Sequence, residues 1–190
     1  MITSRRSILA GVALAAATPV AFAQSPTSPA RAMPGAAPMN PAEVKMAAQF
    51  YSAVIPRAEL SLSTSHLGVE KATNRNAHEF AGFELAEAIG VNMVLKDTLM
   101  GTVPYDMAAE MALVEKMKGT AKGAAFDRAY ITFQLENHQA LHDLADAYLA
   151  NSAGATDPAE KQGRHLGALM LGNFKEHIAI CKRISAELRA

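Results

Sequence analysis

The chain has 190 residues, half of them hydrophobic, and its 18 basic and 18 acidic side chains balance to a formal net charge of zero at pH 7. This length and composition suit one globular domain, and the absence of a basic stripe argues against nucleic acid as a partner. The single cysteine, Cys181, excludes an internal disulfide, so packing must stabilise the fold.

Residues 1–23 resemble an export signal peptide. The cationic start MITSRR precedes the apolar run SILAGVALAAA, and AFA before Gln24 matches a small-x-small cleavage signal. The stretch SRRSIL also resembles a twin-arginine signal, with Ala10 in place of the usual lysine, and an ordinary secretory peptide with two arginines is the alternative. Cleavage before Gln24 would remove two of the 18 basic side chains and none of the 18 acidic ones. We therefore expect a mildly acidic periplasmic protein.

Residues 24–41 are expected to form a flexible leader. The stretch QSPTSPARAMPGAAPMNP is rich in Pro, Ala and Ser and lacks apolar periodicity. The folded domain should then comprise residues 42–190. No run after the signal reaches the roughly 18 to 20 apolar residues that a bilayer-spanning helix needs, so we expect no membrane span in the mature chain.

Capping signals divide this domain into helices. Three stretches combine a cap residue with an acid in the first turn: Asn40-Pro41 with Glu43, Asn76 with Glu79, and Asp157-Pro158 with Glu160. With the apolar periodicity, they predict four long helices and a short one, over residues 42–73, 77–100, 105–118, 124–150 and 158–189.

The same pattern predicts an all-α fold. No run alternates with period two for long enough to indicate a strand. The connections are short and favour antiparallel neighbours, which predicts an up-down four-helix bundle with one short extra helix between the second and third long helices. Pro56 should kink or divide the first helix.

Helical wheels predict the buried face of each long helix. The predicted core residues are Phe50, Val54, Ala58, Leu62 and Val69; Phe80, Ala88, Val91, Leu95 and Leu99; Phe126, Tyr130, Phe133, Leu141, Leu144 and Tyr148; and Leu166, Met170, Phe174, Cys181, Ile184 and Leu188.

Polar groups interrupt these faces in all four long helices. They are Glu59 and His66 in the first, Glu84 and Glu87 in the second, Asp127, Gln134, Asn137 and His138 in the third, and His177 in the last. A buried carboxylate or imidazole costs several kcal/mol unless it is paired, hydrogen-bonded or bound to metal. We therefore expect these groups to meet in one polar layer.

Four stretches resemble one known group of proteins: FYSAVIPRAELSL, EFAGFELAEA, GAAFDRAYITFQLENHQ and LGNFKEHIAICKRI. Over about residues 50–188 the chain is similar to an exported bacterial ferritin-like family of unknown function, whose members often carry the label outer-membrane protein. The resemblance implies a ferritin-like four-helix fold and an exported location, and it brings no established reaction. Its most specific residues are Phe126, Asp127, Tyr130 and His138.

Two further positions match the family and one helix departs from it. His177 matches the histidine of the last helix, and Glu59 matches the acid of the first. In the second helix, Glu87-Ala88 stands where the family has Asp-His, and Glu84 replaces an apolar residue. A metal site in this chain would therefore be richer in oxygen ligands.

We consider five side chains as candidate ligands of a transition metal such as Fe, Mn, Cu or Zn: Glu59, Glu84, Glu87, His138 and His177. Carboxylates and imidazoles together bind such cations. The chain lacks the Glu-x-x-His motif of di-iron bundles, which disfavours a ferroxidase. Its 10 methionines could bind copper but are more typical of core filler.

Two functional classes follow from these patterns. The first is an exported metal-binding bundle linked to envelope, metal or oxidative stress. The second is a non-catalytic structural or interaction bundle, whose buried polar groups hydrogen-bond one another. The sequence contains no established catalytic motif, and it leaves a homo-oligomer and an envelope protein partner open.

Overall fold

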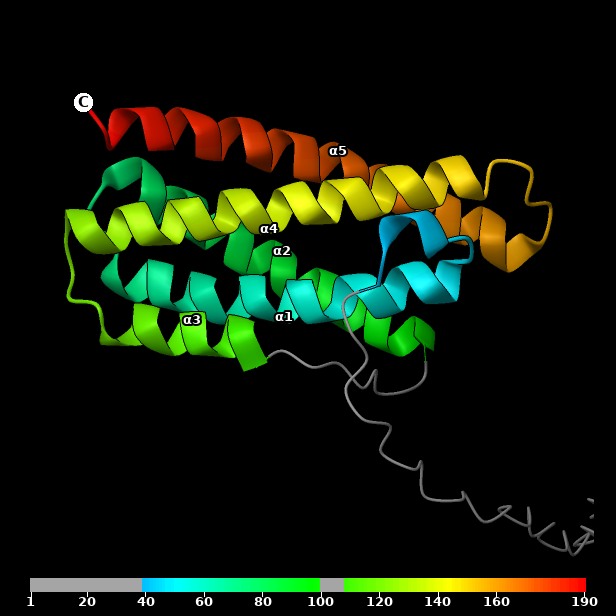
Figure 1. Ribbon diagram of the computed structural model, residues 1–190, viewed down its shortest axis with the longest axis horizontal. Helices are drawn as coiled ribbons and strands as arrows, with labels where there is room; N and C mark the ends of the chain where they lie inside the picture. The colour runs from blue at the N-terminus through cyan, green and yellow to red at the C-terminus, as the bar shows by residue number, and fades with distance from the viewer. Residues whose placement is uncertain (1–38, 100–107) are drawn as a thin grey trace, which may run out of the picture. The chain divides into compact units, whose positions relative to one another are not determined.

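In a computed structural model, residues 39–99 and 108–190 are described, and within these ranges the protein is all-α, with no strand (Figure 1). This confirms the all-α part of the predicted fold class. The helices are the 3₁₀ helix η1 (Pro41–Glu43), α1 (Ala47–Lys71), α2 (Arg75–Leu99), α3 (Ala108–Gly119), α4 (Ala124–Asn151) and α5 (Pro158–Glu187). All of them belong to one compact unit. The predicted signal peptide and nearly all of the predicted leader lie outside the described residues.

The predicted helix starts are only partly correct. Asp157 caps α5 as expected, because its side chain accepts hydrogen bonds from the amides of Ala159 and Glu160. Asn40, in contrast, caps only the short η1 helix. The long helix α1 begins later than predicted, at Ala47. Gln49 Oε1 accepts hydrogen bonds there from the backbone amides of Lys45 and Met46.

The start of α2 also differs from the prediction. The side chain of Asn74, rather than Asn76, accepts a hydrogen bond from the helix, at the Ala77 amide. The reason is a tertiary contact: the buried Asp127 carboxylate accepts from the backbone amides of Thr73 and Asn74 and from the Thr73 hydroxyl. These three hydrogen bonds anchor the turn between α1 and α2 to the first turn of α4.

The direction of the long helices departs from a strict up-down order. Helix α1 is antiparallel to α2, since Glu59 pairs with Lys96 near one end and Gly68 approaches Ala81 near the other. It is also antiparallel to α4, as its residues Arg57 and Ser65 bond to Asn137 and Tyr130 respectively. Helices α2 and α4 are therefore parallel. This direction is possible because α3 runs back along α1 before α4 begins (Figure 1).

Of the two predicted effects of Pro56, a kink or a division, the division does not occur, because α1 continues through this residue. Near the C-terminus of α1 the buried face also differs from the predicted one, because Val69 and His66 are exposed there. Small side chains are buried there instead. At Gly68 an added Cβ would lie 2.7 Å from the Ala81 Cβ and 2.9 Å from the Tyr130 ring, so the close approach of α2 and α4 selects this face.

The apolar core has two parts, one towards each end of the helices. In one, Phe50 and Tyr148 stack with ring centroids 4.7 Å apart. In the other, Phe126 and Tyr130 stack in the same manner. Helix α5 comes closest to α1 and α4 at Gly163, where an added Cβ would lie 2.5 Å from the Ala47 Cβ and 2.6 Å from the Tyr148 hydroxyl.

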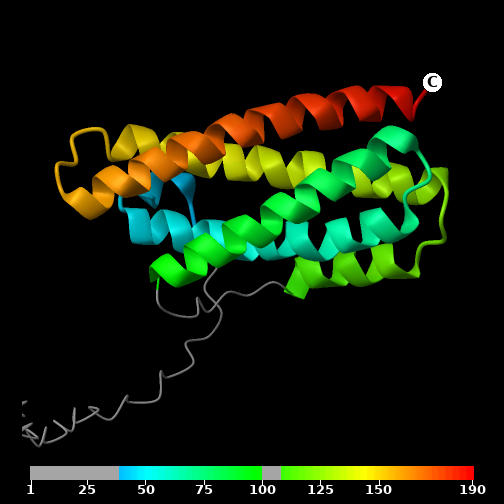
Figure 2. The same cartoon turned by 180° about the vertical axis from the view of Figure 1, so that it is seen from behind.

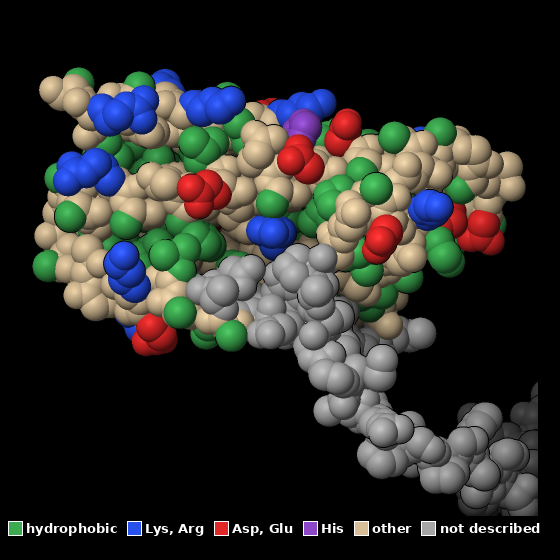
Figure 3. Space-filling model, viewed as in Figure 1, with side chains coloured by type: hydrophobic (Ala, Val, Ile, Leu, Met, Phe, Trp, Pro, Cys, Tyr) green, Lys and Arg blue, Asp and Glu red, His purple; other side chains and the backbone are tan. Residues whose placement is uncertain are grey.

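Polar groups lie between the two apolar parts. Helices α1 and α2 pack extensively, as do α4 and α5, whereas α2 and α5 make few contacts and diverge along their length (Figure 2). Basic and acidic side chains are interspersed over the face seen in Figure 3.

Among the described helices, none combines the length and apolarity required to cross a bilayer.

Candidate metal centre

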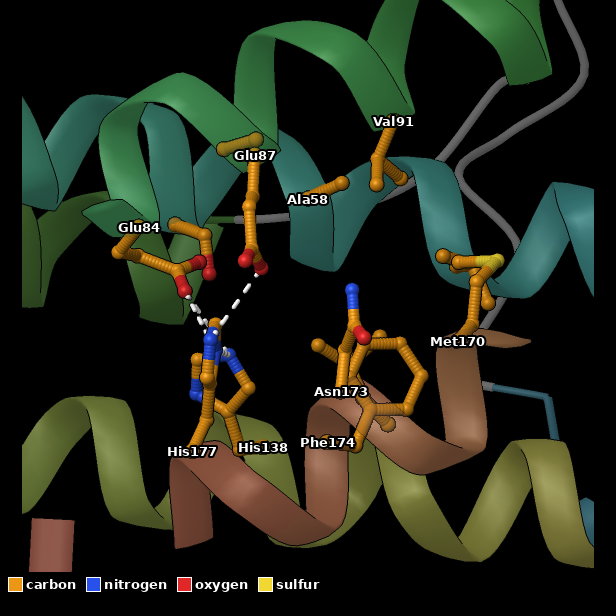
Figure 4. A pocket seen from close by; sticks show the side chains of 13 residues that line it. Ala58, Glu84, Glu87, Val91, His138, Met170, Asn173, Phe174 and His177 are labelled. Carbon is orange, nitrogen blue, oxygen red and sulfur yellow. Dashed lines mark hydrogen bonds and ion pairs between the residues drawn. The ribbon is translucent and has the colours of Figure 1, made fainter. Parts of the chain in front are cut away.

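Three helices each contribute one ligand atom to a buried cluster (Figure 4). Glu84 extends from α2, His138 from α4 and His177 from α5, and all three side chains are buried. The Glu84 Oε2 atom lies 2.8 Å from His177 Nδ1 and 3.2 Å from His138 Nε2. The two ring nitrogens are 3.0 Å apart. The three atoms therefore form a nearly equilateral triangle.

The outer nitrogen of each imidazole faces an acceptor. His138 Nδ1 lies 2.7 Å from the backbone carbonyl of Gln134, one turn earlier in α4. His177 Nε2 lies 3.2 Å from Glu87 Oε2. A carbonyl or ionised carboxylate oxygen can only accept, so a neutral ring that donates to one of these oxygens carries its proton on the outer nitrogen. The inner nitrogens then present lone pairs to one another, which is the arrangement that carboxylates and carbonyls impose on metal-binding histidines.

Glu84 Oε2 makes no hydrogen bond with any described residue. Both imidazole nitrogens are within ion-pair distance of it, but neither contact has the geometry of a hydrogen bond. A buried acceptor without a hydrogen bond costs about 1–3 kcal/mol, and a charged one costs more. A cation bound by all three inner atoms would remove this cost at once.

The electrostatics of the cluster favour a carboxylate with positive charge beside it. Burial alone would raise the pKa of Glu84, but the contacts with His138 and His177 outweigh burial and hold it well below its usual range. Burial alone would lower the pKa of His177, but the carboxylates of Glu84 and Glu87 raise it to about 9. Without a metal, a proton on His177 therefore supplies the positive charge at neutral pH.

The size of the triangle matches neighbouring ligands on one metal ion. Two ligands at right angles on a metal, with bonds of about 2.1 Å, lie about 3.0 Å apart, whereas tetrahedral ligands lie about 3.4 Å apart. The three edges of 2.8, 3.0 and 3.2 Å fit one face of an octahedron. Two histidines and one carboxylate on one face, with the other positions open, is an arrangement typical of non-haem Fe(II).

Two of the five predicted ligands lie apart from the triangle. Glu59 is half-exposed and forms an ion pair with Lys96 at 2.7 Å, so its carboxylate is not part of the cluster. Glu87 is also half-exposed and meets His177 from the outer side, where it can orient the ring rather than share a metal with it. Glu84, His138 and His177 are brought together as the sequence analysis expected.

The prediction of one polar layer is wrong, because the buried polar groups of α4 belong to networks separate from one another and Asp127, Glu59 and His66 lie apart from the histidine cluster. Gln134 and Asn137, which interrupt the apolar face of α4, turn towards α1 and bond to the hydroxyls of Thr64, Ser65 and Ser61. Only His138 turns towards α2 and α5. The side-chain carboxamides of Gln134 and Asn137 thus connect α4 to α1, while His138 connects α4 to the cluster.

Sequence reasoning missed two features of the centre. Phe80, one turn before Glu84, meets the rings of His177 and His138 edge-on, with centroids 5.3 and 6.3 Å away, and so helps to hold both imidazoles. The Gln134 backbone carbonyl orients His138, and no side-chain pattern could reveal it.

We compared the chain with protein-family models, with curated proteins and with solved structures, and none of the three comparisons found a match.

Proposed function

We propose that this protein is an exported helical bundle that binds one divalent transition metal through Glu84, His138 and His177. The observation that carries the proposal is the buried Oε2 atom of Glu84, which has two imidazole nitrogens within 3.2 Å and no hydrogen bond from any described residue. The ligand set suits Fe(II) first, and Mn(II), Cu(II) and Zn(II) are the alternatives.

The export and ferritin-like parts of the proposal have their own support. One long crossover between the second and third long helices, of the kind that α3 provides, is found in ferritin-like bundles. The signal-like start of the chain supports a periplasmic location, with envelope metal or oxidative stress as the setting. If the twin-arginine route is used, changing both Arg5 and Arg6 to Lys should leave unprocessed precursor inside the cell. Normal processing of that variant would favour the ordinary secretory route.

A second candidate is a structural bundle in which the cluster only stabilises the fold. The observation that favours it is the 3.0 Å contact between the two histidines, which becomes a hydrogen bond when one ring is protonated at its inner nitrogen. The pKa of His177, raised to about 9 by Glu84 and Glu87 against the effect of burial, supports such a state at neutral pH. A homo-oligomer or an envelope partner would suit this candidate and stays a prediction.

Thermal melts separate the two candidates. The mature protein and its His177→Ala variant are melted in EDTA and with Fe(II), anaerobically, or with Mn(II), Cu(II) or Zn(II). A metal at 100 times its Kd stabilises the folded state by about 2.7 kcal/mol. In a domain of this size that raises Tm by about 5–10 °C. We expect this rise in the wild type and none in His177→Ala.

The matched control is His142→Ala, which removes a histidine of α4 that contacts Asp143 instead of the cluster. This variant should keep the full metal-dependent rise. If the wild type shows no rise with any of the four metals, and His177→Ala is destabilised equally in EDTA and in metal, the structural candidate replaces the metal-binding one. Metal content of protein purified from the periplasm is the complementary measurement.

A further inference from the structure

A small pocket opens directly beside the candidate metal ligands (Figure 4). Glu84, His138 and His177 all line it, together with residues of α1 and further residues of α2, α4 and α5. Its cavity volume is about 30 Å³. One water molecule needs about 10–15 Å³ by this measure, so the pocket has room for roughly two water-sized groups.

The chemistry of the lining is mostly apolar. The apolar residues that line it include Val54, Ala58, Val91, Leu141, Met170 and Phe174. The hydroxyl of Ser61 is already engaged with Gln134 and Asn137. Asn173 differs, because it is exposed and its carboxamide makes no hydrogen bond with any described residue. Figure 4 shows this side chain extending from α5 towards α2 beside the histidines. It lies one turn before His177 on the same helix.

We propose that this pocket binds a small exogenous ligand, of two or three non-hydrogen atoms, on the metal held by Glu84, His138 and His177, with Asn173 as its hydrogen-bonding partner. The inference rests on the proposed metal binding. Three protein ligands on an octahedral ion leave positions open, and the pocket is the space that these three residues line. Dioxygen, its one-electron-reduced form, nitric oxide and azide are of this size class.

The net charge of the metal site further limits which small ligands can bind there. A divalent ion with one carboxylate and two neutral imidazoles carries a net charge of about +1, which accommodates a neutral molecule or a monoanion. The carboxylate of Glu87 also lines the pocket and opposes ligands with two or more negative charges. Phosphate is therefore excluded by its size, and its dianion by charge as well.

Azide titration of the Co(II)-loaded protein tests the inference, with visible absorption of Co(II) as the readout. Azide should change the spectrum of the wild type with saturation, and phosphate should not. Ala58→Val adds two carbon atoms to the pocket wall, so it should retain Co(II) and lose the azide response. Ala53→Val is the matched control, because Ala53 is on the same helix but does not line the pocket. It should behave as the wild type does.

Asn173→Leu keeps the side chain similar in size and removes the hydrogen bond, so it should weaken azide binding about tenfold without changing Co(II) content. If Ala58→Val does not fold, Val91→Phe fills the pocket from a half-buried position on α2. Unchanged azide binding in the folded pocket-filling variant would overturn the inference. So would Co(II) binding without any azide response in the wild type, and metal binding would then still stand. Failure of the wild type to bind Co(II) or any other metal would overturn both proposals.

Discussion

Glu87 provides the sharpest test of how the cluster would hold a metal. Its Oε2 atom lies 3.2 Å from the outer nitrogen of His177, whereas Glu84 Oε2 lies 2.8 Å from the inner one. The two carboxylates, three residues apart on α2, therefore have different tasks. Glu84 should be a ligand, and Glu87 should orient the imidazole and stabilise its outer N–H.

The geometry sets the expected magnitude. Loss of a group that orients a metal ligand weakens metal binding by about 10- to 100-fold. Glu87 has 42% of its side chain exposed, and water weakens its interaction with His177, so Glu87→Gln should lie at the lower end. A tenfold loss corresponds to about 1.4 kcal/mol. Glu84→Gln, in contrast, removes a buried ligand and should abolish binding.

The assay is competition of each variant against a chromophoric chelator, with whichever metal stabilises the wild type. Glu79→Gln is the matched control, because it neutralises an exposed glutamate on α2 that does not line the pocket. It should bind as the wild type does. If Glu87→Gln abolishes binding as fully as Glu84→Gln, Glu87 is itself a ligand. If Glu87→Gln matches Glu79→Gln, it does not orient His177, and the assignment of the inner nitrogen as the ligand loses its support.

Three further predictions concern the metal-free fold. Burial alone would lower the pKa of His177, but Glu84 and Glu87 raise it from 6.5 to about 9 in the folded state. In EDTA, the free energy of unfolding measured with urea should therefore fall as the pH rises from about 6.5 to 9. This pH dependence should vanish in His177→Ala. The lowered pKa of Glu84 adds no slope in that window. Gly163→Ala should lower the unfolding free energy by about 1–3 kcal/mol, because the added Cβ overpacks the contact with α1 and α4. Gly172→Ala has no atom within 4 Å of its new Cβ and should raise the unfolding free energy by up to about 1 kcal/mol. Equal effects of the two substitutions in urea unfolding would contradict the close packing at Gly163. Asp127→Ala removes the acceptor of three hydrogen bonds from the turn before α2, so it should cost about 2–4 kcal/mol and speed hydrogen exchange in that turn, and unchanged exchange there would refute the anchoring role.

Several features of the fold could be predicted because they depend on local chemistry. The Asp157-Pro158 start of α5 was located correctly because a cap and a proline act within one turn. The buried face of α4 followed from its 3.6-residue period, and every predicted core residue there is buried. The same period placed Glu84 and His177 on buried faces, which made them candidates before any contact was known.

Other features depend on how the helices meet. A helical wheel gives the angle of a side chain around its own axis, but it does not give the height at which that side chain meets a neighbouring helix. Glu59 was therefore grouped with the cluster although it pairs with Lys96 at the surface, and Asp127 holds the turn between α1 and α2 instead of joining His138. The direction of α4 also depended on the return path through α3.

The sequence by itself determined that the chain forms long helices and that Glu84, His138 and His177 lie on their buried faces, because both follow from interactions within a few residues. Only the tertiary structure decided which of these groups share one site. Close approach at Gly68 and Gly163 sets the relative heights of the helices, since no side chain larger than a hydrogen atom fits there. With those heights set, Glu84, His138 and His177 meet within 3.2 Å, and the Gln134 carbonyl and Glu87 lie beside the outer nitrogens, so that the inner nitrogen of each imidazole faces Glu84 Oε2.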